Sequence, residues 1–514
     1  MGAERDEGPA GAPKRGDRAA DAAAGEHRAN VRSGLRWTTV SLLALNVVRF
    51  VTMVVLTAIL TEEDYGLATM AMAFVLSFQA LRDIGLGPAY VNRKDLAPAE
   101  ERLYQSTMFW IVLAMNGAMF TAGWFLAPMA ADFFPKLDGL EGVLRGIFGL
   151  LLIEAFSTTP TAILQKRLQF SRIAAGEMVG MALYAAFSIG YALGGLGAWA
   201  IVLGTLSSRL CQTLYVLRLA AWSPRFEFSR GAAANLFGFG RYLWGNSLLI
   251  ASTKVVDKFV LGKLLGDVVL GRYGVAYNLC TTASKPIWSI ILRVTFPTLS
   301  KIRDDRAAVR AAVVAAITNV GLLVVPLAVG LALVAPDFVR VVYEPKWWSI
   351  VPLVRVLAFF GLVMSLAAIT APVMMALGRV KQLFHFALFG QALMFGLFAA
   401  LHSRGAIGIA SALVASVSIA ETAAFLYLAR TIELSLRSVA VPLARIAAAT
   451  GLMALAVVGV RAGLGDASEL VRLLAAVLAG VVSYGAAQFV TNRERFLESA
   501  RGLRDVAGTR RART

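Results

Sequence analysis

Residues 35–60 have the sequence LRWTTVSLLALNVVRFVTMVVLTAIL, and residues 239–265 have the sequence FGRYLWGNSLLIASTKVVDKFVLGKLL. Each stretch is long enough for a helix that crosses the hydrocarbon core of a bilayer, which is about 30 Å thick. Each also holds a cation inside its apolar segment, Arg49 in the first stretch and Lys254 in the second. These two stretches therefore predict two membrane helices with a charge at a similar depth.

The two cations occupy equivalent positions of an internal repeat. The interval from Arg49 to Gly66 equals the interval from Lys254 to Gly271, without a gap. A cation at the centre of a bilayer costs about 2.5–3.5 kcal/mol on insertion scales. Two such cations in register indicate a selected cationic site between two halves of a membrane protein, suited to an anion.

The composition supports a membrane protein. The chain of 514 residues is 58% hydrophobic and 16% charged, and its mean hydropathy is +0.68. These values lie far from those of soluble domains. The net charge of +18 would suggest nucleic acid in a soluble protein, but the basic residues are spread over short loops and two tails, which membrane topology explains better.

About fourteen apolar stretches of helical length predict an all-α, polytopic membrane protein. Their length argues against a transmembrane barrel, whose strands need only about ten alternating residues. The expected helices span residues 34–60, 65–91, 103–127, 140–163, 172–194, 195–219, 236–262, 268–292, 308–334, 349–377, 381–401, 405–429, 439–461 and 470–490.

The internal repeat organises the expected domains. Pro160 and Arg167 in PTAILQKR are echoed by Pro372 and Arg379 in PVMMALGR. Two halves of six helices insert the same way, so we expect parallel repeats around a central cavity, with alternating access across it. The expected units are a disordered basic cytoplasmic tail (1–33), the first six-helix repeat (34–222), the second six-helix repeat (233–430), two additional helices (439–490) and a basic cytoplasmic tail (491–514).

Basic residues in alternate loops predict the orientation. The opposite loops are nearly bare or acidic, as in TEEDY at 61–65. The positive-inside rule then places both termini in the cytoplasm of a bacterial plasma (inner) membrane protein. The basic loops contain Arg93, Lys94, Arg102, Lys166, Arg167, Arg172, Arg218, Arg225, Arg230, Lys301, Arg303, Arg306, Arg310, Arg379, Lys381, Arg430 and Arg437.

An ordered set of short motifs resembles a known family. The motifs are LTEEDYGLATMAMAF, LRDIGLGPAYVNR and QKRLQFSRIA in the first half, and VVDKFVLGKLLGDVVLGRYGVAYNL and FPTLSKIRDD in the second. Over roughly residues 34–430 the chain resembles the Wzx-type polysaccharide transporters of the multidrug/oligosaccharidyl-lipid/polysaccharide flippase superfamily. The resemblance implies a flippase that moves lipid-linked oligosaccharide repeat units across the plasma membrane for lipopolysaccharide, capsule or exopolysaccharide synthesis. Polymerase and chain-length components of the assembly system are its implied partners.

The residue chemistry fits a polyprenyl-diphosphate sugar, which has an anionic headgroup and a polar glycan. On the first helix, Asn46, Arg49 and Thr52 follow at three-residue spacing and share a face. Arginine suits a diphosphate because its planar fork binds two oxygens at once. The candidate substrate-binding residues are Asn46, Arg49, Asn246, Lys254, Asp257 and Lys258.

Each candidate charge also has a structural interpretation. Lys254–Asp257 or Asp257–Lys258 can be a neutralising pair, and Lys258 can extend toward the outer interface. Glu154, near the middle of the fourth helix, is either a proton-coupling carboxylate or a packing residue. Adjacent Arg82 and Asp83, near a helix end, suggest a local interface pair. The remaining intramembrane charges, Arg209 and Glu421, are weaker candidates.

No cofactor or metal site is expected. Cys211 and Cys280 form no CxxC pattern, and the three histidines are scattered. GRYLWGNS at 240–247 mimics a phosphate-binding loop, but Asn246 stands where the lysine belongs. With no nucleotide-binding domain in the sequence, energy would come from an ion gradient, the membrane potential or the substrate gradient.

Three rival functions remain at this point. A cation-coupled multidrug exporter of the same superfamily often uses a carboxylate in its first helix, whereas Arg49 dominates that helix here. A peptidoglycan lipid-precursor flippase also needs a cationic cavity, and only the motifs separate it from polysaccharide export. A membrane polymerase or ligase would devote a large outer loop to chemistry, and the longest outer loops, near 128–140 and 335–348, are short. The sequence therefore favours a transporter, not an enzyme.

Overall fold

The computed structural model describes residues 44–491 except 83, 94–95, 303–304 and 466; for 238–251, 283 and 285–301 it describes only the backbone. The expected tail 1–33 and nearly all of the tail 491–514 lie outside the described residues. Within them the chain is helical and contains no strand, which confirms the all-α prediction.

Successive long helices run in alternate directions and match the expected segments. The first described helix is Ala44–Ile59. It is followed by α2 (Glu62–Arg82), α3 (Leu86–Val91), α4 (Pro98–Phe133), α5 (Leu140–Lys166), α6 (Phe170–Leu193), α7 (Ala198–Ala220), α8 (Arg230–Leu265), α9 (Asp267–Ile302), α10 (Arg306–Val342), η1 (Pro345–Ile350), α11 (Val351–Ala376), α12 (Val380–Leu401), η2 (His402–Arg404), α13 (Gly405–Thr431), α14 (Leu436–Gly463) and α15 (Glu469–Thr491).

One expected helix is broken in two. The segment predicted at 65–91 ends as α2 at Arg82 and begins again as α3 at Leu86. Gly85, which precedes α3, has a φ of 72°, in the left-handed region that glycine adopts without strain. The predicted segment ran across this break although Arg82 and Gly85 interrupt the apolar pattern there. The break places the start of α3 beside the end of α2.

The described helices are apolar enough for a membrane. Ten segments have the length and hydropathy of membrane spans, and one of these, 380–431, contains both α12 and α13. Helices α8 and α9 are not among the ten. Helix α8 is less apolar because it carries Lys254, Asp257, Lys258 and Lys263 within three turns. The chain is thus a multi-pass membrane protein whose seventh expected helix is unusually charged.

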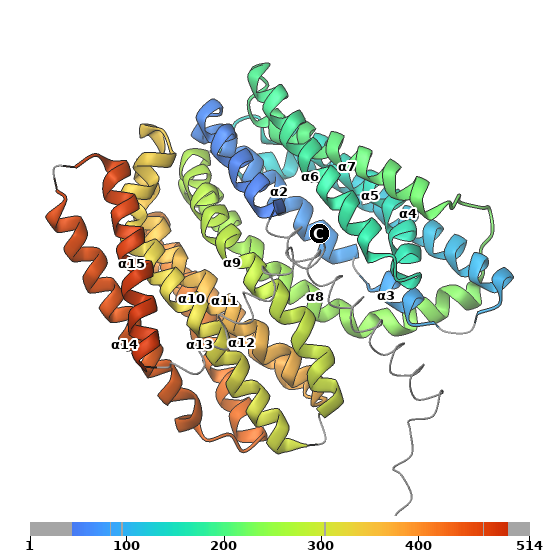
Figure 1. The fold of residues 1–514 in the computed structure, drawn as a ribbon. Coiled ribbons are helices and arrows are strands. Elements are labelled where there is room, and N and C mark those ends of the chain that lie inside the picture. Colours follow the sequence, from blue (N-terminus) through green and yellow to red (C-terminus); the bar gives the residue numbers. More distant parts are fainter. Residues whose placement is uncertain (1–43, 83, 94–95, 303–304, 466, 492–514) are drawn as a thin grey trace, which may run out of the picture.

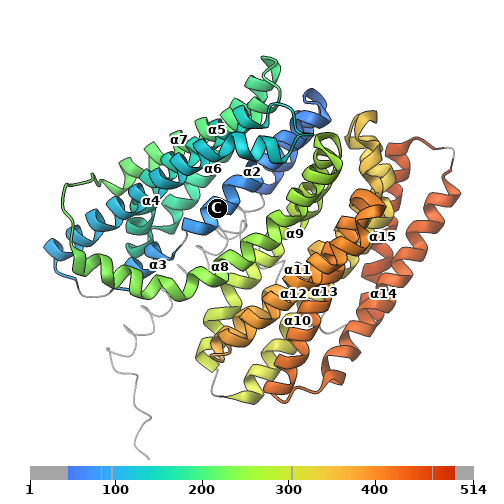
Figure 2. The ribbon, with the colours of Figure 1, turned by 180° about the vertical axis from the view of Figure 1, so that it is seen from behind.

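The helices form two groups (Figure 1). In the first half α5 packs on α2, α4 and α7, and α6 packs on α7. In the second half α11 packs on α9, α10 and α13, and α12 packs on α13. Helices α14 and α15 pack on each other and on α10. Seen from behind, they again lie at the outer edge of the second half, away from the first (Figure 2). This arrangement confirms two six-helix repeats with two added helices.

The two halves meet where α2 and α9 begin. A Cβ at Gly66 would clash with the carbonyl oxygen of Asp267, and a Cβ at Gly271 would clash with that of Glu62. The pairs 66/271 and 62/267 are related by the same sequence offset, so the contact is symmetric between the halves. Glycine at both positions permits the close approach of the two helices. We call this end of the molecule the closed end.

The second repeat match also has a structural counterpart. Pro160 lies inside α5 and Pro372 inside α11. Each helix ends in a turn with a left-handed residue, Leu168 (φ 56°) after α5 and Gly378 (φ 72°) after α11. The left-handed residue follows the proline by two residues more in the first half than in the second. The two turns are therefore similar but not at identical positions of the repeat.

The added helices are joined to α10 by charge. Asp337 of α10, whose side chain is only 2% exposed, accepts hydrogen bonds from Arg461 of α14 at 2.5 Å and Arg472 of α15 at 2.9 Å. Arg461 also donates to the carbonyl oxygen of Leu333. A buried carboxylate with two arginine partners holds both helices against the second half; we call this cluster the Asp337 clamp.

Candidate functional site

A cavity of about 780 Å³ lies between the two halves. Its walls come from the first helix, α2, α6 and α7 on one side and from α8 and α9 on the other. The α2–α9 crossing borders it, since Tyr65 and Gly274 both line the cavity. The predicted central cavity is therefore present, and both repeats build it.

Arg49 and Lys254 both line this central cavity, and both side chains are exposed to it. Within the described residues neither side chain makes a hydrogen bond or an ion pair. Lys254 is positioned by the adjoining turn of α8, where Gln391 of α12 donates to the hydroxyls of Ser252 and Thr253. The structure thus brings together the two cations that the repeat placed in register, with their hydrogen-bonding capacity available.

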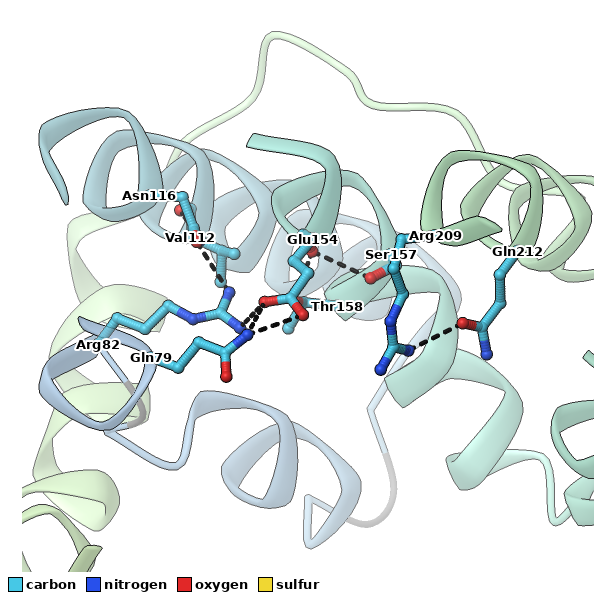
Figure 3. Close-up of polar contacts among 9 residues, drawn as sticks. All are labelled: Gln79, Arg82, Val112, Asn116, Glu154, Ser157, Thr158, Arg209 and Gln212. Carbon is cyan, nitrogen blue, oxygen red and sulfur yellow. Dashed lines mark hydrogen bonds and ion pairs between the residues drawn. The ribbon is translucent and has the colours of Figure 1, made fainter. Parts of the chain in front are cut away.

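Further polar residues of the central cavity come from α6 and α7. Arg209, a secondary candidate in the sequence, donates to the Oε1 atom of Gln212 at 2.8 Å (Figure 3). Glu177 and Tyr184 of α6 face the same space. Sequence reasoning missed these two residues, but a helical pattern could have found them. The lining positions recur at intervals of three and four on both helices: Glu177, Gly180, Met181 and Tyr184, and Thr205, Ser208, Arg209 and Gln212.

Asp257 and Lys258 form a structural pair. The Nζ atom of Lys258 lies 3.1 Å from both carboxylate oxygens of Asp257, which is fully buried. Tyr273 donates its hydroxyl proton to the same carboxylate at 2.5 Å, and the Lys258 ammonium lies 4.0 Å from the ring centroid of Tyr277. Lys258 borders the central cavity but is held inward by these contacts instead of extending to the interface.

The two candidate asparagines contribute less to the cavity. Arg49 and Thr52 line it together, as their shared face predicted, whereas Asn46 is half-buried at the edge of that face and is not part of the lining. Asn246 lies within α8, and its side chain lies outside the described residues. Their roles stay predictions.

A second cavity of about 450 Å³ adjoins the central one and is lined by residues of the first half and by Lys254 of α8. Glu154 of α5 accepts hydrogen bonds there from Gln79 at 3.0 Å and from Arg82 at 2.5 Å (Figure 3). Arg82 also donates to the Oδ1 atom of Asn116 on α4 at 2.8 Å. The sequence suggested a local partner for Arg82, Asp83, which lies outside the described residues; the partner seen is Glu154, from a different helix. Glu154 is therefore part of a salt-bridged network.

The closed end is held by contacts between the halves. Arg272 of α9 makes two hydrogen bonds of 2.9 Å to the carboxylate of Glu62 on α2. Beside this pair, Trp347 of η1 donates its indole proton to the carbonyl oxygen of Thr57 at 2.8 Å. These contacts and the glycine crossing block the central cavity at this end, so a substrate must enter from elsewhere.

A match to a family model shows the relationships of the chain. Residues 55–352 match the model described as polysaccharide biosynthesis protein. The chain belongs to this polysaccharide biosynthesis family. The match begins at the end of the first helix and contains α2 and α9, the helices that cross between the repeats. It confirms the resemblance drawn from the motifs.

Members of the family with curated names are similar over most of their length. The chain is 26% identical over 362 residues to the lipopolysaccharide biosynthesis protein WzxC of Escherichia coli (strain K12), covering 70% of this chain and 72% of that one. It is 24% identical over 362 residues to the succinoglycan biosynthesis transport protein ExoT of Rhizobium meliloti (strain 1021), again with 70% and 72% coverage.

Among solved structures, the lipid II flippase MurJ in an inward closed conformation has the same fold. The TM-score is 0.69, and the match covers 88% of this chain and 99% of that chain at 14% sequence identity. At this identity the likeness shows the fold alone. It supports the two-repeat architecture and leaves the substrate to the residues of the cavity.

Proposed function

We propose that the protein is a flippase that moves polyprenyl-diphosphate-linked oligosaccharide units from the inner to the outer leaflet of the bacterial plasma membrane. The observation that carries the proposal is the pair Arg49 and Lys254, one from each half, exposed in a single cavity of about 780 Å³. Side-chain cations that make no hydrogen bond or ion pair with any described residue are available to a diphosphate. Because the chain belongs to a family of polysaccharide biosynthesis proteins, we take the diphosphate to carry a glycan.

The mechanism we propose is alternating access between the repeats 34–222 and 233–430. The diphosphate binds Arg49 and Lys254 while the lipid tail stays among the helices. Opening of the α2–α9 crossing and of the Glu62–Arg272 pair then exposes the headgroup at the closed end. Weaker binding of the diphosphate by these cations in the second state would then aid its release.

The orientation we propose places both termini in the cytoplasm. The alternate directions of the helices put the closed end beside the acidic loop at 61–65 and the basic loops at the other end, as the positive-inside rule requires. The closed end then faces outward, where a polymerase and chain-length components would receive the translocated unit. Helices 439–490 would move with the second repeat, since the Asp337 clamp joins them to α10.

The test is a deletion strain with leaflet assignment of its polyprenyl-linked oligosaccharides. We expect complete units to accumulate on the cytoplasmic leaflet and surface polymer to be lost. Wild-type protein restores both, and the double variant Arg49→Ala/Lys254→Ala lowers transport about 100-fold, because it removes two charge-assisted contacts to the diphosphate. Protein abundance in the membrane should stay unchanged.

The control variant is Lys381→Ala/Arg404→Ala, which removes the same charges from exposed positions outside both cavities. It should transport like the wild type. Equal transport by the Arg49/Lys254 variant and the wild type would contradict the proposed site. Units that accumulate on the outer leaflet would contradict the flippase function, because they place the block after translocation.

A further inference from the structure

The second cavity shares two lining residues with the central one, Leu76 and Lys254. A group held at Lys254 therefore has direct access to both spaces. We infer that the second cavity is a sugar-binding subsite, which holds the glycan unit nearest the diphosphate. The inference rests on the proposed function, since it takes the diphosphate to lie at Arg49 and Lys254.

The lining of the second cavity has the chemistry of hydroxyl recognition. The amides of Gln79 and Asn116 and the hydroxyl of Thr158 can each donate and accept hydrogen bonds. The Arg82 guanidinium, which also lines the cavity, only donates. A carboxylate offers about four acceptor sites, and Glu154 uses three for Gln79 and Arg82. Capacity remains for sugar hydroxyls that donate to Glu154 and accept from the amides.

The subsite is also rigidly built. Arg82 is fixed between Glu154 and Asn116, and Asn116 in turn donates to the carbonyl oxygen of Val112 at 2.7 Å. Figure 3 shows these side chains converging from separate helices, with the oxygen of Gln79 directed away from Glu154. Groups that are already oriented lose little conformational entropy when a ligand binds, which favours recognition of a polar ligand.

Other parts of the lipid-linked substrate fit this space poorly. The polyprenyl tail would remove water from Glu154, Arg82 and Gln79 without offering hydrogen bonds in return, and such burial is unfavourable. A second phosphate would lie beside the Glu154 carboxylate, and since both groups only accept hydrogen bonds, the remaining acceptor sites of Glu154 would have no donor. A neutral sugar avoids both penalties, and it is attached to the diphosphate that Lys254 contacts in the proposed mechanism.

The experiment compares two lipids on full-length protein in nanodiscs. The probes are undecaprenyl diphosphate without a sugar and the oligosaccharide-linked undecaprenyl diphosphate extracted from producing cells. We expect the wild type to bind the sugar-bearing lipid at least about tenfold more tightly. Gln79→Met removes the amide at nearly constant volume, and it should abolish most of this preference while leaving the Kd for the bare lipid unchanged.

The matched control is Gln105→Met. Gln105 of α4 donates to Tyr90 at 2.8 Å and lines neither cavity, so the same substitution there should keep the preference. Unchanged affinity for the bare lipid shows that Gln79→Met is folded. A wild type that binds both lipids equally, or a Gln79→Met protein that keeps the preference, would overturn the sugar subsite alone. A wild type that binds neither lipid would overturn the proposed function itself.

Discussion

The central cavity and the Asp337 clamp both hold cations within the helical bundle, but their surroundings differ. In the clamp, Arg461 and Arg472 share one buried carboxylate. In the cavity, Arg49 and Lys254 are exposed and make no ion pair with any described residue. An intramembrane cation therefore indicates a binding site only when the fold leaves it without a structural partner.

The same contrast occurs within one helix. Lys254 and Lys258 are one turn apart on α8, and both border the central cavity. Lys258 is 7% exposed and bonded to Asp257, whereas Lys254 is exposed. Two lysines that look equivalent in sequence therefore have a structural role and a proposed binding role, and substitutions can separate these roles.

The largest effect is expected at the clamp. Asp337→Ala leaves two arginines without their shared countercharge, which should lower the free energy of unfolding by about 3 kcal/mol. Thermal unfolding of the purified protein measures this, with Asp138→Ala at an exposed position as the control. Transport per folded molecule should stay close to the wild-type value. A stable Asp337→Ala protein that fails to transport would instead place the clamp in the transport mechanism.

The next effect separates the two lysines. Lys258→Met leaves Asp257 buried with only Tyr273 as a described partner and should destabilise the protein by about 2 kcal/mol. Lys254→Met should leave the unfolding temperature unchanged and reduce transport. Both variants are measured for unfolding and for transport in the same membranes. If they lose stability equally, the distinction between a paired and an available lysine is wrong.

The smallest effect concerns the kind of cation. Arg49→Lys keeps the charge but replaces the planar fork by a point charge, so we expect transport to fall about tenfold. Lys254→Arg keeps the charge too and should change transport less, because it adds donors. The ratio of initial rates with each variant measures the difference. Equal rates for Arg49→Lys and the wild type would show that charge alone matters at Arg49.

Much of the fold could be predicted from hydropathy and the repeat. The apolar segments determine the helices because every backbone polar group must be satisfied inside the bilayer. The register of Arg49 with Lys254 and of Gly66 with Gly271 placed these residues at the interface between halves. The break at Gly85 was not predicted, because the segment 65–91 was defined by its overall hydropathy, although Arg82 and Gly85 interrupt the apolar run.

The site was predictable only in part. The cations of the central cavity were found because charge is costly in a membrane, and this cost is visible in one sequence. The ion pairs elsewhere in the bundle were not found, since Glu154 contacts Arg82 across 72 residues and Asp337 contacts Arg461 across 124. Contacts over such separations depend on how the helices pack, which periodicity does not specify.

The amino-acid sequence alone predicts a helical membrane protein with two similar halves and a cation in each. Hydrophobic length and charge at bilayer depth are local properties, and the bilayer acts on them directly. Which charges neutralise one another and which face a cavity depends on how the helices pack. Asp257 pairs with Lys258, and Lys254 stays exposed, because helix packing fixes which side of α8 is buried. The packing thereby separates a structural ion pair from a proposed binding residue.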